Sequence, residues 1–296
     1  MRRTAALLLA LVLLACGDDA AVTTTAPAGF SVEIAGITLD APPQRIISGS
    51  PTHTEILFAI GAGDQVIAVD AFSDFPAEAA ALPRLDAFNP SVEGFAALDP
   101  DLVVLTFDPG EVVEGLAALG VPALVLDAPV TVEDVYVQIL QLGDLTDNRA
   151  GAEAVTGSMR SDIAALLETL PEATEPLTYY HELDPTYYSV GSDTFLGSLY
   201  GMLGMSSIAD AAGGGWPQLS AEFIVEADPD FVFLADTLCC GVTPEAVAER
   251  PGWETMTAVR QGRVIPVDES LASRWGPRLV EFLEKVAVAV HAGSDA

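Results

Sequence analysis

Two adjacent cysteines and three histidines are the side chains of this sequence that most invite a chemical role. The histidines, His53, His181 and His291, are too few and too far apart to form a zinc-transport site. The sequence has no Gly-x-Ser-x-Gly elbow for a nucleophilic serine and no phosphate-loop lysine, and the glycines at residues 213–215 lack the partners of a phosphate loop. These patterns favour a binding protein over an enzyme, and a hydrolase is the weakest alternative.

The start of the chain has the pattern of an export and lipidation signal. Two arginines precede an apolar run at residues 4–15, which is too short to span a bilayer as a permanent helix. The run ends in Leu13-Leu14-Ala15-Cys16, which resembles a bacterial lipobox, whose cysteine is lipidated and becomes the mature N-terminus. We expect residues 1–15 to be a removed leader, Cys16 to anchor the chain at the membrane, and residues 16–29 to form a flexible tether. The alternatives are a plain signal peptide or an uncleaved anchor.

Cys239 and Cys240 remain after the leader is removed. In an exported protein they should be oxidised, and a disulfide between the two neighbours is the simplest pairing. A free thiol pair and a metal site are the alternatives. The metal site is disfavoured, because no second pair of Cys or His residues lies at ligand spacing.

Composition bounds the size of the fold and the kind of partner. The chain has 296 residues, 50% of them apolar, which is enough for two modest domains. Its formal net charge is −31, so it lacks the basic face that the phosphates of nucleic acid require. The charge also predicts a very soluble surface of a kind that suits high salt.

Residues 45–69 predict a strand, a turn, a helix and a second strand. An apolar run is interrupted by Gly49-Ser50-Pro51, and Thr52 with Glu55 three residues later fits a capping box. Such a unit places residues 48–53 at the carboxyl edge of a parallel sheet, where open α/β folds bind ligands.

Strand and helix patterns alternate along the rest of the chain, which indicates parallel α/β lobes. Alternation at residues 30–39 suggests an edge hairpin. Apolar residues at three- and four-residue steps predict one long helix over residues 147–170, capped by Asp147 and ended by Pro171. Further strands are predicted at residues 102–105, 123–126, 177–181, 231–234 and 264–267, and further helices at 91–98, 111–119, 131–142, 195–203, 221–226 and 277–291.

The two halves of the chain share a repeated pattern. Ser91-Val92-Glu93 precedes Asp99-Pro100-Asp101 and an apolar strand, and Ser220-Ala221-Glu222 precedes Asp228-Pro229-Asp230 and another apolar strand. This internal repeat predicts two related lobes. We expect an N-terminal lobe at residues 30–145, a linking helix at 146–171 and a C-terminal lobe at 172–296.

Two α/β lobes, one linking helix and a lipid anchor together resemble the substrate-binding proteins of ABC importers, in particular those that carry cobalamin and ferric siderophores. The segments that carry the resemblance are RIISGSPTHTEILFAIGA at 45–62, SDFP at 73–76, VEGFAALDPDLVVL at 92–105, WPQLSAE at 216–222 and RPGWETMTAVRQGRVIPVD at 250–268. The WPQLS stretch is most similar to the cobalamin-binding members. The resemblance implies two Rossmann-like α/β lobes joined by one long backbone helix.

The resemblance also implies a set of site residues. Aromatic side chains from both lobes would frame the ligand, with an arginine clamp beside them: Phe72, Phe88, Phe107 as a looser match, Tyr188, Trp216 and Arg274. Phe88 and Phe107 fit equally well as core residues, and Arg274 could pair with a surface carboxylate. Trp216 follows three glycines and precedes a proline, which favours ligand contact over core packing.

One glutamate in each lobe, Glu93 and Glu222, would dock on arginines of a dimeric permease, as implied by the resemblance. The alternative is that both glutamates are ordinary solvent-exposed residues, since the chain as a whole is strongly acidic. We expect a monomer outside the cytoplasm that holds no cofactor of its own and passes a corrinoid or a ferric siderophore to a permease and its ATPase. A haem carrier of the same fold, with Tyr187, Tyr188 or His181 on the iron, and a receptor without a permease are the alternatives.

Overall fold

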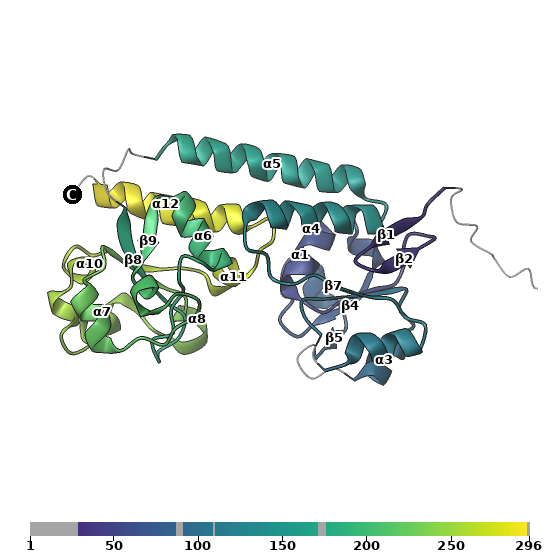
Figure 1. Cartoon of the computed structure of the whole chain (residues 1–296), viewed down its shortest axis with the longest axis horizontal. Coiled ribbons are helices and arrows are strands. Elements are labelled where there is room, and N and C mark those ends of the chain that lie inside the picture. The colour runs from purple at the N-terminus through teal and green to yellow at the C-terminus, as the bar shows by residue number, and fades with distance from the viewer. Residues whose placement is uncertain (1–28, 87–90, 109, 171–175, 295–296) are drawn as a thin grey trace, which may run out of the picture.

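The computed structural model describes residues 29–86, 91–108, 110–170 and 176–294 (Figure 1). Cys16 and Phe88 lie outside the described residues. The chain forms two α/β lobes that lie side by side beneath a layer of long helices (Figure 1). The predicted two-lobe α/β architecture is therefore confirmed.

The N-terminal lobe is built on a parallel sheet. Its order is β5-β4-β3-β6-β7 within the described residues, and every pairing is parallel. The strands are β3 (Ile46–Ser48), β4 (Val66–Asp70), β5 (Arg84–Leu85), β6 (Leu102–Leu105) and β7 (Ala123–Val125). Every residue of β3 and β6 is buried, as expected for central strands covered on both faces.

The C-terminal lobe repeats the arrangement with the order β11-β10-β8-β9, again all parallel. Its strands are β8 (Leu177–Glu182), β9 (Met205–Ser207), β10 (Phe231–Leu234) and β11 (Val264–Pro266). A short antiparallel hairpin, β1 (Val32–Ile34) with β2 (Ile37–Leu39), forms the remaining sheet. The hairpin prediction is thus confirmed, but the hairpin is a separate sheet and does not extend an edge of the large one.

Helices cover both sheets. They are α1 (Pro51–Ala59), α2 (Val92–Ala96), α3 (Val112–Ala118), α4 (Val132–Leu145), α5 (Arg149–Glu168), α6 (Phe195–Met202), α7 (Ala221–Ala227), α8 (Thr237–Cys240), α9 (Pro244–Ala248), α10 (Thr257–Arg260), α11 (Glu269–Ser273) and α12 (Leu279–Ser294). None of the helices in the described part of the chain is long and apolar enough to cross a membrane.

Helix α5 links the lobes. It runs above both of them, packed on α4 over the N-terminal lobe and on α12 over the C-terminal lobe (Figure 1). Gly151 allows the close packing at its start, because a Cβ atom there would overlap the carbonyl oxygen of Ile60 at the end of α1. Met159 and Ile163 of α5 belong to one buried apolar cluster that continues from the N-terminal sheet into the C-terminal sheet. A shared core of this kind opposes large hinge motion between the lobes.

The repeated sequence pattern gives the same local structure twice. The Ser91 hydroxyl accepts the Gly94 N–H at 3.0 Å and caps α2, and the Ser220 hydroxyl accepts the Phe223 N–H at 3.2 Å and caps α7. Each helix is followed by an aspartate with positive φ, Asp99 at 47° and Asp228 at 45°, before a buried strand. The repeat therefore reflects two similarly built lobes.

Two predicted helix caps are wrong. Helix α1 begins after Ser50 with Pro51 in its first turn, and no side chain caps it, so Thr52 and Glu55 form no capping box. Proline is pre-organised for the first helical position, which moves the helix start ahead of Thr52. Helix α5 likewise begins after Asn148 without a side-chain cap, because Asp147 has a φ of 58° in the turn that precedes it.

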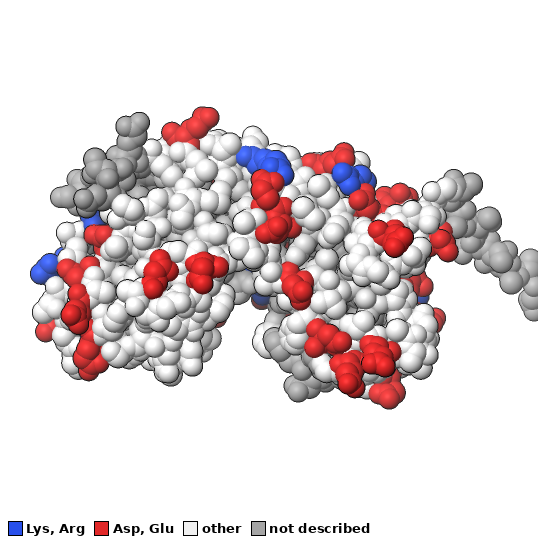
Figure 2. Space-filling view, viewed as in Figure 1, with Lys and Arg blue, Asp and Glu red and all other residues white. Residues whose placement is uncertain are grey.

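Acidic side chains are spread over the visible face of both lobes, and basic side chains are few (Figure 2). This surface agrees with the formal net charge of −31. Net charge of this size affects solubility and the approach of charged ligands more than it affects the fold.

Candidate functional site

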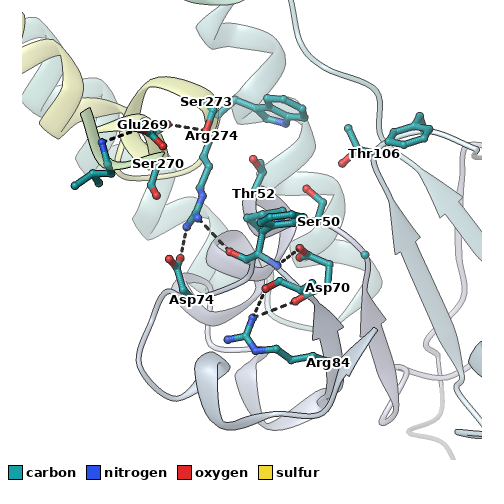
Figure 3. A pocket seen from close by; sticks show the side chains of 17 residues that line it. Ser50, Thr52, Asp70, Asp74, Arg84, Thr106, Glu269, Ser270, Ser273 and Arg274 are labelled. Atoms are coloured by element: carbon teal, nitrogen blue, oxygen red, sulfur yellow. Dashed lines mark hydrogen bonds and ion pairs between the residues drawn. The ribbon is translucent and has the colours of Figure 1, made fainter. Parts of the chain in front are cut away.

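A cavity of about 720 Å³, here called the cleft cavity, lies between the lobes (Figure 3). From the N-terminal lobe it is lined mainly by residues at or just after the ends of three strands: 49–52 after β3, 70–72 and 74 at the end of β4, and 106–107 after β6, together with Arg84 of β5. From the C-terminal lobe it is lined by Leu238 and by part of the segment from α11 to Trp275. The cavity therefore lies at the carboxyl ends of parallel strands, where ligand sites are expected in open α/β folds.

A second cavity of about 380 Å³, here called the tryptophan cavity, lies beside the first. Its lining is mainly apolar and comes largely from the C-terminal lobe: Ala128, Leu183, Phe195, Leu196, Trp216, Ala235, Cys239 and Ala272. Glu269, Ser273 and Trp275 line both cavities. The segment around α11 therefore divides one interlobe opening into two adjoining compartments.

Three of the aromatic side chains predicted for the site are exposed and line these compartments. Phe72 is 59% exposed and Phe107 is 45% exposed in the cleft cavity, and Trp216 is 56% exposed in the tryptophan cavity. Core packing therefore does not account for Phe107. Tyr188 is also exposed, but its backbone forms an isolated β-bridge with Gln218, and the residue lines neither cavity. The two lobes thus both contribute exposed rings to one opening.

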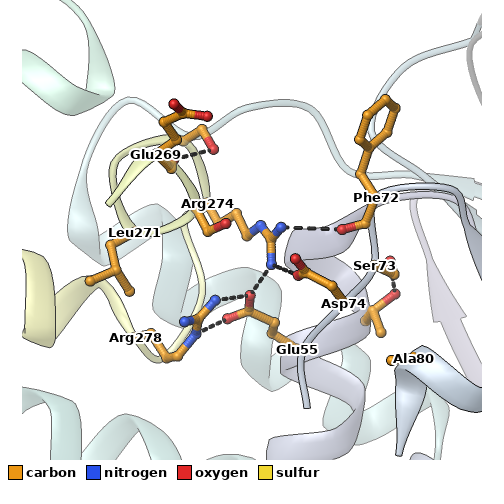
Figure 4. A network of polar contacts seen from close by, with 12 residues as sticks. Glu55, Phe72, Ser73, Asp74, Ala80, Glu269, Leu271, Arg274 and Arg278 are labelled. Atoms are coloured by element: carbon orange, nitrogen blue, oxygen red, sulfur yellow. Dashed lines mark hydrogen bonds and ion pairs between the residues drawn. The ribbon is translucent and has the colours of Figure 1, made fainter. Parts of the chain in front are cut away.

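Arg274 lines the cleft cavity, yet its guanidinium group binds the other lobe (Figure 4). It donates to Glu55 and Asp74, both at 2.8 Å, and to the carbonyl oxygen of Phe72 at 3.1 Å. Arg278 donates to both oxygens of Glu55, at 2.9 and 2.6 Å. We call this set, Glu55, Asp74, Arg274 and Arg278, the interlobe ion network. It ties the segment before α12 to the N-terminal lobe and also fixes the backbone of Phe72.

The sequence alone does not predict the interlobe ion network. It places Glu55 in a local capping box, although the partners of Glu55 lie 219 and 223 residues away in the chain. The signal for it was weak: a glutamate within an apolar helix, in a sequence where arginine is scarce. Neither feature indicates which arginine it binds.

Two aspartates at the edge of the cleft cavity have shifted pKa values. Burial alone would raise the pKa of Asp74, but the hydrogen bond and charge of Arg274 outweigh it and lower that pKa. Burial raises the pKa of Asp70, against the opposing effect of hydrogen bonds from Ser73 and from the Phe72 N–H. Asp74 is therefore the more firmly ionised of the two.

A disulfide joins Cys239 and Cys240 at the end of α8. The N–H groups of Leu238 and Cys239 both donate to one oxygen of Glu269, at 2.9 and 2.7 Å, which holds α8 against α11. Leu238 lines the cleft cavity and Cys239 the tryptophan cavity. The disulfide therefore lies at the junction of the two compartments.

Reduction of this disulfide is expected to lower the free energy of unfolding by only roughly 1 kcal/mol, because a ring closed by adjacent residues restricts the unfolded chain little. Urea unfolding with and without a reductant measures the change, and a Cys239→Ser/Cys240→Ser variant should not respond to the reductant. A loss above about 3 kcal/mol, or stoichiometric zinc in the purified protein, would contradict this assignment.

The histidines lie away from the ligand space. His53 in α1 and His181 in β8 are fully buried, and neither lines either cavity. Burial lowers the pKa of His53 to about 4 and that of His181 to about 3, so both rings are neutral at neutral pH. His181 Nδ1 lies 2.8 Å from the Tyr200 hydroxyl. An axial contact from His181 to a metal in the ligand is therefore not supported, and no metal-binding cluster occurs among the described residues.

Glu93 and Glu222 occupy equivalent positions in the first turns of α2 and α7, and both are exposed. Helix α7, and α3 with which α2 packs, lie on the side of the lobes away from α5 (Figure 1). Each lobe therefore presents one glutamate at a repeated surface position.

Comparison with known proteins places these features in context. The periplasmic binding protein family matches residues 46–271. The chain is 31% identical to an uncharacterised ABC transporter substrate-binding lipoprotein, YvrC, of Bacillus subtilis, covering 97% of this chain and 96% of the relative. It is 31% identical to a cobalamin-binding protein of Halobacterium salinarum, over 86% of this chain and 71% of that one. Among solved structures it is similar to the periplasmic heme-binding protein RhuT of Roseiflexus, with a TM-score of 0.76, 25% identity, and coverage of 85% and 99%.

Proposed function

The chain belongs to the periplasmic binding protein family, and from this we propose that it captures a cobalamin-like corrinoid, or a ferric siderophore, between its lobes. It is the extracytoplasmic substrate-binding component of an ABC importer, and it delivers its ligand to the permease. One relative is described as an ABC transporter substrate-binding lipoprotein, which supports a role in transport. Attachment to the membrane through lipid on Cys16 is part of the proposal.

The observation that carries the ligand proposal is the interlobe opening with exposed rings on both sides. Phe72 and Phe107 face it from the N-terminal lobe and Trp216 from the C-terminal lobe. Its two compartments, of about 720 and 380 Å³, together exceed the size of an ordinary drug-sized pocket. Large flat rings that stay exposed without ligand suit a large, flat ligand, because binding would bury them.

A thermal-shift screen tests the proposal. The mature protein is heated with cobalamin, cobinamide, haem and several ferric siderophores, and a ligand that binds only the folded state raises the melting temperature by mass action. We expect the largest rise with a corrinoid. No rise with any of these chelates, for a protein that unfolds cooperatively, would contradict the proposal.

Haem is the second candidate, since a similar solved structure is described as heme-binding. Coordination of the iron by this chain is less well supported. His181 is buried, and the ring of Tyr187 packs against Trp253 rather than into a cavity. A Soret band on haem titration, with weaker binding of cobalamin, would favour haem over a corrinoid.

Docking on the permease is proposed to use Glu93 and Glu222. A Glu93→Lys/Glu222→Lys variant should stimulate the ATPase of the reconstituted importer with a half-maximal concentration at least about tenfold higher, because it sets like charges against each other at the interface. Ligand affinity should not change. A Glu168→Lys/Glu284→Lys variant, with exposed glutamates on α5 and α12 and the same change in net charge, serves as the control. Equal losses in both variants would show that only net charge matters.

A further inference from the structure

The two cavities are lined by more acidic than basic groups. Among the described residues, three carboxylate side chains line them, Asp70, Asp74 and Glu269, against two guanidinium groups, Arg84 and Arg274. Both arginines belong to the cleft cavity alone, so the tryptophan cavity is lined by no basic group of the described residues. The chain as a whole has a formal net charge of −31. A ligand with negative charge would therefore approach against the field of the protein.

The two guanidinium groups are already engaged by the protein. Arg274 donates to Glu55, Asp74 and the Phe72 carbonyl in the interlobe ion network. Arg84 donates to the carbonyl oxygens of Ala71 at 2.8 Å and Asp70 at 3.3 Å (Figure 3). Because Glu55 and Asp74 already balance the charge of Arg274, a ligand carboxylate would gain little from pairing with it. The contacts of Arg84 with backbone carbonyls orient its guanidinium group without balancing its charge.

Acceptors for N–H groups, in contrast, face the ligand space. Glu269 lines both cavities, and its position is fixed because one of its oxygens accepts the N–H groups of Leu238 and Cys239. The side chains of Ser50, Thr52 and Thr106 line the cleft cavity as well (Figure 3). Carboxylates and hydroxyls accept hydrogen bonds from an amide, whereas a ligand carboxylate offers no donor and adds repulsion.

We propose that this cleft selects an uncharged or cationic chelate whose edge carries amide N–H groups, and discriminates against a chelate of the same size whose edge carries carboxylates. The selection rests on the proposed capture of a chelate between the lobes. Glu269 is the specificity-determining residue, because it is the charged side chain shared by both compartments. The aromatic rings supply affinity for either ligand, and Glu269 with the acidic field sets the preference between them.

Two matched ligand pairs test the selection. One pair is cyanocobalamin and its monocarboxylate, in which one propionamide is hydrolysed; the other is the dimethyl ester of haem and haem itself. In the cobalamin pair we expect the acid to bind about tenfold more weakly at low ionic strength, as for one added like charge several ångströms away. In the haem pair, where two carboxylates are added, the loss of affinity should be larger. The difference should shrink as salt shortens the screening length to about 3 Å at 1 M.

Two variants test whether the difference in affinity within a ligand pair arises from the cleft. Glu269→Gln keeps an oxygen for the N–H groups of Leu238 and Cys239 and should narrow the difference within a pair. Glu254→Gln, which removes an exposed carboxylate that lines neither cavity, changes the net charge equally and should leave the difference as it is. If a pair binds and its acid member binds equally or more tightly, the charge selection is overturned and the proposed function stands. If neither pair binds, the proposed corrinoid or haem capture fails, and the selection falls with it.

Discussion

Replacing Glu55 by glutamine is expected to lower the free energy of unfolding by about 3 kcal/mol. The side chain of Glu55 is 1% exposed, and it binds Arg274 and Arg278, whose side chains are 9% and 18% exposed. Removing the one carboxylate that both arginines share leaves two poorly hydrated positive charges facing each other. The loss of stability comes mainly from leaving the arginines buried without their partner, and less from the net stabilisation that the ion pairs provide. Urea unfolding measures it.

An exposed ion pair provides the control for this change. Arg149 binds Glu153 at 2.8 Å on the surface of α5, where the two side chains are 48% and 60% exposed. Glu153→Gln should cost no more than about 0.5 kcal/mol. If Glu55→Gln proves as mild as Glu153→Gln, the network does not hold the lobes together. Ligand affinity should fall as well in Glu55→Gln, because Arg274 also holds the backbone of Phe72.

Replacing Trp216 by alanine is expected to weaken ligand binding by about 2 kcal/mol or more, which corresponds to roughly a thirtyfold higher Kd. The ring is 56% exposed in the tryptophan cavity, so a ligand there would bury it on binding. For the same reason the folded protein should lose little stability. Equilibrium titration with the ligand found in the screen measures the change in Kd.

Leu119→Ala controls for the loss of an exposed apolar side chain. Leu119 is 57% exposed at the end of α3 and lines neither cavity. Its removal should leave the Kd unchanged. Equal affinities for Trp216→Ala and the unaltered protein would place the ligand outside the tryptophan cavity.

Local sequence patterns were sufficient to predict most of the fold. The apolar runs that form β6 and β10 are buried on both faces, and such runs indicate central parallel strands whatever surrounds them. The Ser-x-Glu helix starts of α2 and α7 follow from hydrogen bonds within three residues. The short helices α8, α9, α10 and α11 are not predicted, because helices of four or five residues carry too few turns to show a period.

Site residues could be predicted only where the residue type and its neighbours in the sequence leave few possible roles for the side chain. A tryptophan between glycines and a proline has few ways to be buried, so Trp216 was assigned to the ligand opening, and it does line a cavity there. Only the resemblance predicts Tyr188 as a ligand-binding residue. In the structure its backbone forms a β-bridge with Gln218, and the residue lines neither cavity. The partners of Arg274 depend on how two lobes pack, and no local pattern records that packing.

Capture of a corrinoid between the lobes is tested most directly by calorimetric titration of the mature protein with cyanocobalamin. One ligand per chain should bind with a Kd in the micromolar range or below, corresponding to about −8 kcal/mol or better, and the same titration of Trp216→Ala should show markedly weaker binding. Absence of any binding heat across several temperatures, from protein shown to be folded, would contradict corrinoid capture.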